Sequence, residues 1–281
     1  MHPDRLRVSV GPGALAVTRY GHADRAVVLV HGFPLSSFCW RAVAPVLARA
    51  GWMAICPDLL GHGESDRPLD APLDPVAQAR WTREAIGALG LSRVALVGHE
   101  MGALTAAAVA ASAPALVTRL VLVSPLVPEA MPPADVGAMQ RETGRMALRL
   151  ARDLAAAAEL VEGLVRGRMH ASDALDARVV ARATAPFVGR EGVRQLLGLA
   201  RALDAMPEGG ADWRAIRART LLLLGAHETD AVAGAATRFV DQWQATHAER
   251  IGGAGALCPE EAPAELAARI LTFLTTPESP E

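Results

Sequence analysis

A carboxylate stands at a sharp turn near the middle of the chain. The segment VALVGHEMGAL, residues 94–104, passes from an apolar run through Gly98-x-Glu100-x-Gly102 into an alanine-rich helical pattern. Small residues on both sides permit a tight, strained turn that directs the central side chain outward. We therefore expect Glu100 over a helix N-terminus, where backbone N–H groups such as that of Met101 favour negative charge.

A second motif supplies another backbone donor. The loop His31-Gly32-Phe33-Pro34 follows an earlier apolar run, and loops of this kind bring a backbone N–H, here that of Phe33, toward the turn. Two converging donors form an oxyanion hole, so Phe33 and Met101 are the predicted donors.

Three motifs, in their order and spacing, resemble the α/β-hydrolase superfamily: HGFP, then PDLLGHGESDRP at 57–68, then VGHEMG. The chain looks most like the epoxide hydrolase and haloalkane dehalogenase branch, whose turn carries a carboxylate nucleophile. The resemblance implies an acid after the strand in LLLLGAHETD, residues 221–230, and Glu228 or Asp230 supplies it. It also implies a histidine in the stretch GGAGALCPEEAPAE, residues 252–265, where this chain has Ala256.

These changes leave three functions open. Without a histidine to activate water, an ester formed on Glu100 should accumulate, which disfavours an epoxide, halide or ester hydrolase. A carboxylate can instead act as a general base or acid beside the oxyanion hole, with no covalent intermediate. In the third alternative, the longer Glu100 side chain folds back into the oxyanion hole, and the chain is a hydrolase shell that only binds a ligand.

We favour proton transfer, such as epimerisation, cyclisation or elimination. Members of the superfamily with altered triads occur among tailoring enzymes of actinobacterial natural products, and the resemblance implies a similar role here. All 28 basic residues are Arg, a composition that fits a GC-rich source and excludes lysine chemistry.

The ligand is expected to be a mostly apolar small molecule or peptide-like compound that carries a carbonyl group. His170, in the segment RGRMHASD, is the histidine that could approach Glu100 from above. The residues expected to line the pocket are Pro34, Phe38, Trp40 and Phe187. The segment 127–206 is rich in methionine and poor in aromatic residues, which indicates an adaptable apolar cavity.

Strand-like and helix-like segments alternate along the chain. A hairpin is predicted around residues 11–13, and continuously apolar strands are predicted in RAVVLVHG, MAICPD, RVALVGH, RLVLVSP and RTLLLLGA. Helices are predicted over residues 39–49, 74–89, 101–113, 231–243 and 261–274. This alternation predicts an α/β fold with a mostly parallel central sheet flanked by helices.

One long interval lacks strand patterns. Residues 127–206 show only Ala/Arg/Leu-rich helical periodicity, for example in MALRLARDLAAAAELVEGLVRG. We expect a core formed by residues 1–126 and 207–281, and a helical lid formed by 127–206. Ligands bind at the carboxyl ends of the strands in such sheets, so the lid would cover the site.

The amino-acid composition limits the kinds of partner and cofactor that are expected. The formal net charge is −2 and the arginines are scattered, which argues against nucleic acid or a membrane surface as a partner. No signal peptide or bilayer-length apolar run is visible, so we expect a cytoplasmic protein, as a monomer or homodimer. Three widely spaced cysteines and the absence of ligand spacing predict no disulfide framework and no metal. No nucleotide cofactor is expected, because no GxGxxG follows a strand.

Overall fold

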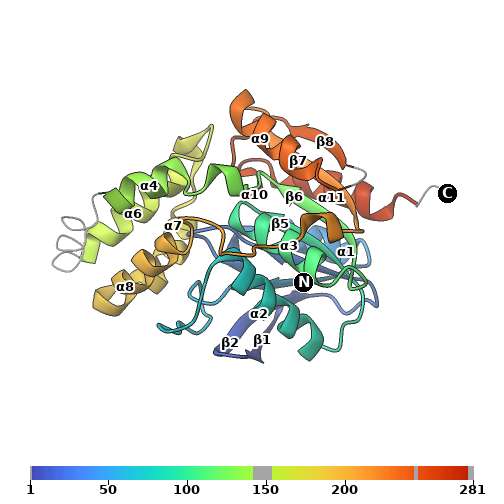
Figure 1. Ribbon diagram of the computed structural model, residues 1–281, viewed down its shortest axis with the longest axis horizontal. Coiled ribbons are helices and arrows are strands. Elements are labelled where there is room, and N and C mark those ends of the chain that lie inside the picture. Colours follow the sequence, from blue (N-terminus) through green and yellow to red (C-terminus); the bar gives the residue numbers. More distant parts are fainter. Residues whose placement is uncertain (1, 142–153, 244–245, 278–281) are drawn as a thin grey trace.

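The computed structural model describes residues 2–141, 154–243 and 246–277. An eight-stranded sheet lies at its centre, with helices around it (Figure 1). The strand order is β1-β2-β4-β3-β5-β6-β7-β8. The β1–β2 and β2–β4 pairs are antiparallel, and every other pair is parallel. The strands are β1 Asp4–Val10, β2 Gly13–Tyr20, β3 Ala26–Val30, β4 Met53–Pro57, β5 Val94–His99, β6 Val117–Val123, β7 Arg219–Gly225 and β8 Thr246–Ile251.

Helices pack on this sheet as the alternation predicts, and the α/β-hydrolase fold is confirmed. Residues 127–206 are called the covering segment below. The helices outside it are η1 Ser37–Trp40, α1 Ala44–Arg49, α2 Pro75–Ala88, α3 Met101–Ser112, η5 Trp213–Ala215, α9 Asp230–Val240, α10 Cys258–Glu261 and α11 Pro263–Thr275. The central strands β3 and β5 are buried along their whole length, because helices cover both faces of a parallel sheet.

Two elements differ from the sequence predictions. The single helix predicted over 39–49 is divided into η1 and α1. The strand β8 was not predicted from THAERI. Residues 247–250 are exposed or only partly buried, as on an edge strand, and of the described residues 247–251 only Ile251 is buried, so the segment gives no apolar run.

The segment between β6 and β7 contains no strand within residues 124–141 and 154–218, as its periodicity predicts. Its helices are η2 Pro128–Ala130, α4 Ala134–Arg141, α6 Leu154–Arg166, η3 Ser172–Ala174, α7 Ala177–Thr184, η4 Ala185–Phe187 and α8 Gly189–Arg201. In Figure 1 α4, α6, α7 and α8 lie together at one side of the sheet. The predicted helical pattern over 142–153 lies outside the described residues, and the division into core and lid stays a prediction.

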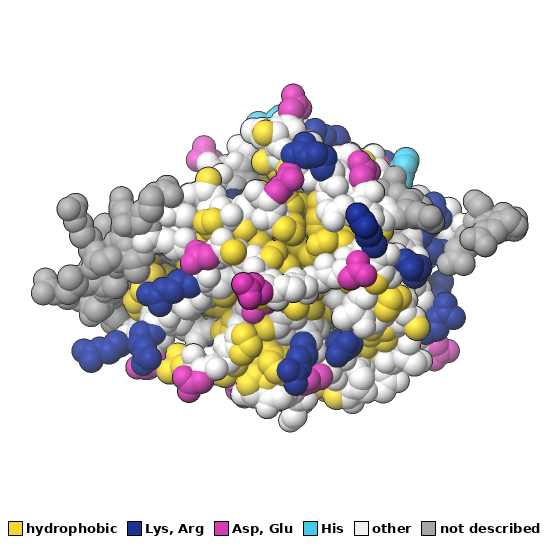
Figure 2. Space-filling model, viewed as in Figure 1, with side chains coloured by type: hydrophobic (Ala, Val, Ile, Leu, Met, Phe, Trp, Pro, Cys, Tyr) yellow, Lys and Arg dark blue, Asp and Glu magenta, His cyan; other side chains and the backbone are white. Residues whose placement is uncertain are grey.

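Charged side chains are spread over the visible face, while apolar side chains gather at its middle (Figure 2). Among the residues that the structure describes, no helix has both the length and the apolar character needed to cross a membrane.

Candidate active site

The turn after β5 places Glu100 at the N-terminus of α3. Glu100 has φ 53° and ψ −118°, a conformation that few residues other than glycine adopt, and its side chain is buried. A Cβ at Gly98 or Gly102 would clash with the backbone of the turn or of the His31 loop. A Cβ at Gly32 would lie 2.6 Å from Glu100 Oε2. Glycines therefore allow the two loops to meet.

Both predicted oxyanion-hole donors form hydrogen bonds to the same carboxylate oxygen of Glu100. Glu100 Oε2 accepts hydrogen bonds from the Phe33 N–H at 2.8 Å and from the Met101 N–H at 2.6 Å. The two donors converge as the sequence indicates, but they bind the protein's own carboxylate. In this arrangement they are not available to stabilise negative charge on a ligand.

The other oxygen of Glu100 faces a guanidinium. Arg168, two residues after α6 ends, places Nη1 3.4 Å from Glu100 Oε1. Its Nε donates to Asp135 Oδ2 at 2.9 Å, and Nη1 also donates to the carbonyl oxygen of Phe33. Burial alone would lower the pKa of Arg168, but Glu100 and Asp135 hold it above its usual value. Arg168 thus joins the covering segment to both loops of the site.

The protonation of Glu100 is set by opposing effects. Burial raises the pKa of its carboxyl, and Asp135 adds to this. Arg168 and the N–H groups of Met101 and Phe33 act in the opposite direction. Burial outweighs them, so the pKa lies above the ordinary value of a glutamate.

The sequence position at which the family resemblance implies a histidine is Ala256. Ala256 lines the same cavity as Glu100, and its carbonyl oxygen accepts a hydrogen bond from His99 Nε2 at 2.8 Å. Burial lowers the pKa of His99 to about 4 and keeps the ring neutral. His99 is therefore committed to the backbone beside the turn.

The two predicted acids after β7 have different places. Glu228 lines the cavity, and its Oε1 accepts hydrogen bonds from the Ser124 hydroxyl and, at 2.8 Å, from the Gly225 N–H. Burial raises the pKa of Glu228. Asp230 is exposed at the start of α9 and does not line the cavity, so of the two only Glu228 joins the site.

The site opens into a cavity of about 1170 Å³ between the strand ends and the covering helices. Most of its lining side chains are apolar, which suits a mainly apolar ligand. His170 lines this cavity and stacks on His227, with ring centroids 3.4 Å apart and an angle of 3° between the rings. His170 was expected from the sequence to approach Glu100 from above. In the structure His170 lies in the wall of the cavity, and its ring is stacked on that of His227.

The four residues expected to line the pocket lie elsewhere. Pro34, Phe38, Trp40 and Phe187 are not among the residues that line the cavity with Glu100. Trp40 and Phe187 are fully buried, the first beside His99 and the second beside His62. Phe38 lies under the Arg41 guanidinium, and Pro34 is buried in the loop after Phe33. Pro34, Phe38 and Trp40 thus pack in the loop and helix that follow Phe33, while Phe187, in η4 between β6 and β7, packs edge-to-face with His62.

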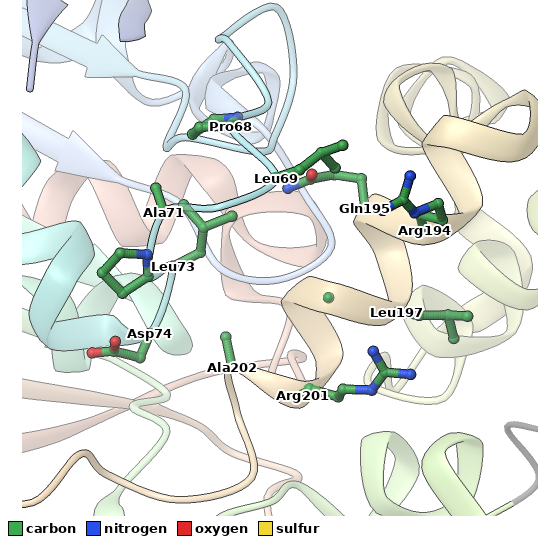
Figure 3. A pocket seen from close by; sticks show the side chains of 12 residues that line it. Pro68, Leu69, Ala71, Leu73, Asp74, Arg194, Gln195, Leu197, Arg201 and Ala202 are labelled. Atoms are coloured by element: carbon green, nitrogen blue, oxygen red, sulfur yellow. The ribbon is translucent and has the colours of Figure 1, made fainter. Parts of the chain in front are cut away.

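A second hollow, of about 640 Å³, lies between residues 68–74 and α8 (Figure 3). Arg194 and Arg201 of α8 and Asp74, at the start of α2, contribute to its wall. None of the predicted catalytic residues reaches it, so we place the chemistry in the larger cavity.

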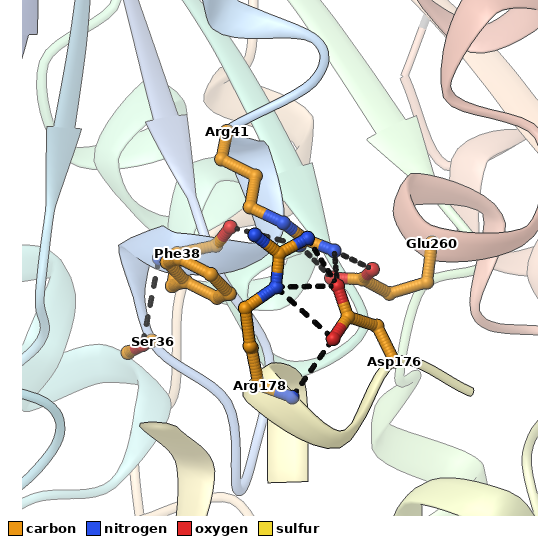
Figure 4. A network of polar contacts seen from close by, with 6 residues as sticks. All are labelled: Ser36, Phe38, Arg41, Asp176, Arg178 and Glu260. Carbon is orange, nitrogen blue, oxygen red and sulfur yellow. Dashed lines mark hydrogen bonds and ion pairs between the residues drawn. The ribbon is translucent and has the colours of Figure 1, made fainter. Parts of the chain in front are cut away.

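An ionic network ties the covering segment to the core (Figure 4). Arg41, just after η1, binds Glu260 of α10 through both oxygens, at 2.7 and 2.8 Å. Its Nη2 also lies 3.6 Å from Asp176 at the start of α7, and Asp176 in turn binds Arg178. This network fixes α7 over the core.

Three residues of the site were not identified from the sequence: Arg168, Asp135 and Ser124. Arg168 is one of 28 arginines, and nothing in its local pattern distinguishes it. Ser124 follows an apolar strand directly, so the rule that ligands bind at strand ends could have identified it.

The comparisons with known proteins support the α/β-hydrolase fold. The family model for the alpha/beta hydrolase fold matches residues 25–211, and the chain belongs to this family. An uncharacterized protein of Mycobacterium tuberculosis is 37% identical over 122 residues, which is 43% of this chain and 35% of that protein. An epoxide hydrolase of Caballeronia sordidicola is 43% identical over 93 residues, 32% of this chain and 27% of that enzyme. The aligned part of the chain thus spans about a third of the length of these relatives.

Solved structures share the fold over nearly the whole chain. Cfl2 from Burkholderia cenocepacia has a TM-score of 0.77 and 24% identity, over 96% of this chain and 95% of that one. An epoxide hydrolase from an endophytic Streptomyces has a TM-score of 0.77 and 22% identity, over 97% of this chain and 95% of that one. At these identities the likeness shows the fold alone.

Proposed function

We propose that the chain is an enzyme that transfers a proton to and from a small molecule, with Glu100 as the general acid–base catalyst. The observation that carries this proposal is the asymmetric anchoring of the carboxyl. Two backbone donors hold Oε2, while Oε1 is bound by no hydrogen-bond donor of the turn, and the residue lines the large cavity. A carboxyl with one fixed oxygen presents the other in a defined direction, as proton transfer requires.

Two further features support this chemistry. The raised pKa of Glu100 brings its proton affinity closer to that needed to exchange a proton near neutral pH. Because Glu100 itself occupies the oxyanion hole, negative charge that develops on the ligand would be stabilised by Arg168 rather than by Phe33 and Met101.

Hydrolysis through an ester on Glu100 is the alternative that the epoxide hydrolase relatives suggest. The histidine base of these relatives has no counterpart at its usual sequence position: Ala256 stands where a histidine would activate water, and His99 is bound to a carbonyl oxygen. We therefore propose a non-hydrolytic reaction, such as epimerisation, cyclisation or elimination, in the tailoring of an apolar, carbonyl-bearing natural product.

A ligand-binding shell without catalysis is the second candidate. It is favoured by the filled oxyanion hole together with the ion pair that Arg168 makes to Glu100. In that case the carboxylate and the guanidinium neutralise each other and only maintain the shape of the cavity.

Separating binding from turnover tests the proposal. Carbonyl-bearing apolar compounds that raise the melting temperature of the wild-type protein would be followed for conversion, in wild type and in Glu100→Gln. We expect Glu100→Gln to keep the thermal shift and to lose about a hundredfold or more of the turnover, as is typical for removal of a general base. Equal turnover of a ligand by both proteins would reject a catalytic role for Glu100. Binding with no conversion by either protein would favour the shell.

Exposure to an epoxide or an alkyl halide distinguishes the hydrolase alternative from proton transfer by Glu100. A nucleophilic Glu100 would retain the reagent as an ester, because no base releases it, and the intact mass would rise. We expect no such adduct on Glu100.

A further inference from the structure

Two adjacent strand ends share an unusual backbone conformation. Glu100 (φ 53°) and Ser124 (φ 43°) are the non-glycine residues with positive φ in the part of the chain that the structure describes. They are neighbours: His99 of β5 is paired with Val123 of β6, and the Glu100 N–H donates to the Val123 carbonyl at 3.0 Å. Backbone strain of this kind is concentrated at functional sites, which directs attention to Ser124.

Ser124 has a base within hydrogen-bond reach. Its hydroxyl donates to Glu228 Oε1, and the same oxygen accepts the Gly225 N–H at 2.8 Å. A hydroxyl, a base bound to it, and a third group that orients the base are the parts of an activated nucleophile. Here they come from the ends of β6 and β7, one strand away from Glu100.

The pair also faces the ligand space. Ser124 and Glu228 both line the cavity of about 1170 Å³, although the serine is only 5% exposed. Because the serine proton is directed at Glu228, the lone pairs of Oγ are left for an electrophile in the cavity. Burial raises the pKa of Glu228, which makes it a stronger base than an exposed glutamate.

The neighbouring thiol of Cys258 does not compete with Ser124 as a nucleophile. Cys258 Sγ lies 3.7 Å from Ser124 Oγ and donates to the Gly255 carbonyl at 3.4 Å. Burial raises the pKa of this thiol to about 12, so it is protonated near neutral pH.

We propose that Ser124 is a nucleophile activated by Glu228, and that this pair forms a second reactive centre that accepts the acyl group of an ester. Ser124 Oγ forms a bond to the carbonyl carbon while the bond to the ester oxygen breaks. The serine proton passes to Glu228 and then to the departing alkoxide, which leaves as an alcohol. Water then attacks the acyl-serine, gives one proton to Glu228, and releases the acid as that proton returns to Ser124.

A fluorophosphonate tests this centre without a known substrate, because it forms an Oγ–P bond with loss of fluoride. The full chain would be treated with an alkyl fluorophosphonate, followed by intact mass and peptide mapping. We expect one adduct, on Ser124, and no adduct in Ser124→Gly, a variant that keeps the positive φ without strain. Glu228→Gln should slow labelling about a hundredfold, as loss of a general base does. Cys258→Ala is the matched control and should be labelled at the wild-type rate.

Three results would overturn the proposal. They are no adduct under conditions that fully label a serine esterase treated in parallel, an adduct that persists in Ser124→Gly, or equal labelling rates for wild type and Glu228→Gln. Circular dichroism checks that each variant is folded. If Glu228→Gln does not fold, Glu228→Asp takes its place: slower labelling would support the role of the base, and an unchanged rate would contradict it.

Discussion

At the scale of single residues, the site is defined by how the charge of Glu100 is balanced. The carboxyl is buried, which disfavours its ionised form, but two N–H groups and Arg168 favour that form. A buried ion pair is sensitive to the loss of one partner, since the remaining charge stays in a medium of low polarity. Arg168 also faces Asp135, so two carboxylates depend on one guanidinium.

Arg168→Met should therefore destabilise the fold by about 3–5 kcal/mol, the usual cost of breaking a buried pair. The side chain of Arg168 is only 13% exposed. Adding Glu100→Gln should recover part of this loss, because one uncompensated charge is removed. Urea unfolding measures both effects, and Arg194→Met, which breaks an exposed pair with Glu191, is the control with a cost below about 1 kcal/mol. Equal costs for Arg168→Met and Arg194→Met would contradict the buried pair.

His99 should make stability depend on pH in a definite window. Its pKa is about 4 in the folded protein and near 6.5 when unfolded, so the unfolded chain binds the extra proton between these values. The free energy of unfolding should fall as the pH drops from 6.5 to 4, by about 3 kcal/mol from this residue. The difference between wild type and His99→Gln, followed by urea unfolding across this range, isolates the contribution. Parallel pH profiles would show that His99 is not buried as a neutral ring.

At the scale of elements, the site is formed where strands end. Glu100, Ser124 and Glu228 follow β5, β6 and β7, which are neighbours in the sheet, and α6 leads to Arg168 above them. The position of the covering helices therefore determines whether Arg168 meets Glu100. The network around Arg41 fixes α7 of this segment to the core.

Glu260→Gln should loosen this attachment and cost about 1–3 kcal/mol, between the values for exposed and for fully buried pairs. The Glu260 side chain is 6% exposed and makes two hydrogen bonds to Arg41. Thermal unfolding compares it with Glu191→Gln, whose carboxylate is 68% exposed and should matter little. A loss no greater for Glu260→Gln than for Glu191→Gln would show that the network does not hold α7.

The sequence was sufficient to predict the elements that are strongly apolar or periodic. Seven of the eight strands, the turn at Glu100 and the convergence of the Phe33 and Met101 donors follow from local pattern, since glycines and apolar runs are local signals. The edge strand β8 was missed because it has no apolar run. The direction of the Glu100 carboxyl, the pairing with Arg168 and the wall of the cavity depend on contacts between distant segments, which one sequence does not show.

At the scale of the whole molecule, the fold is that of an α/β hydrolase. The sheet and its helices hold the loops of Phe33 and Met101 together, and residues of the covering segment form part of the wall of a large, mostly apolar cavity. Within this frame the carboxyl of Glu100 accepts hydrogen bonds from the N–H groups of Phe33 and Met101, the two donors predicted to form an oxyanion hole. We propose that this fold of an α/β hydrolase carries a carboxyl that transfers a proton.

The most direct measurement is the incorporation of deuterium from D2O into a bound ligand. Carbonyl-bearing compounds that stabilise the wild-type protein would be incubated with it and followed by proton NMR, with Glu100→Gln in parallel. We expect the wild-type protein to exchange a C–H next to the carbonyl, and Glu100→Gln to bind the same compound but exchange it about a hundredfold more slowly. Exchange at the same rate in both proteins, or conversion by addition of water without exchange, would contradict proton transfer by Glu100.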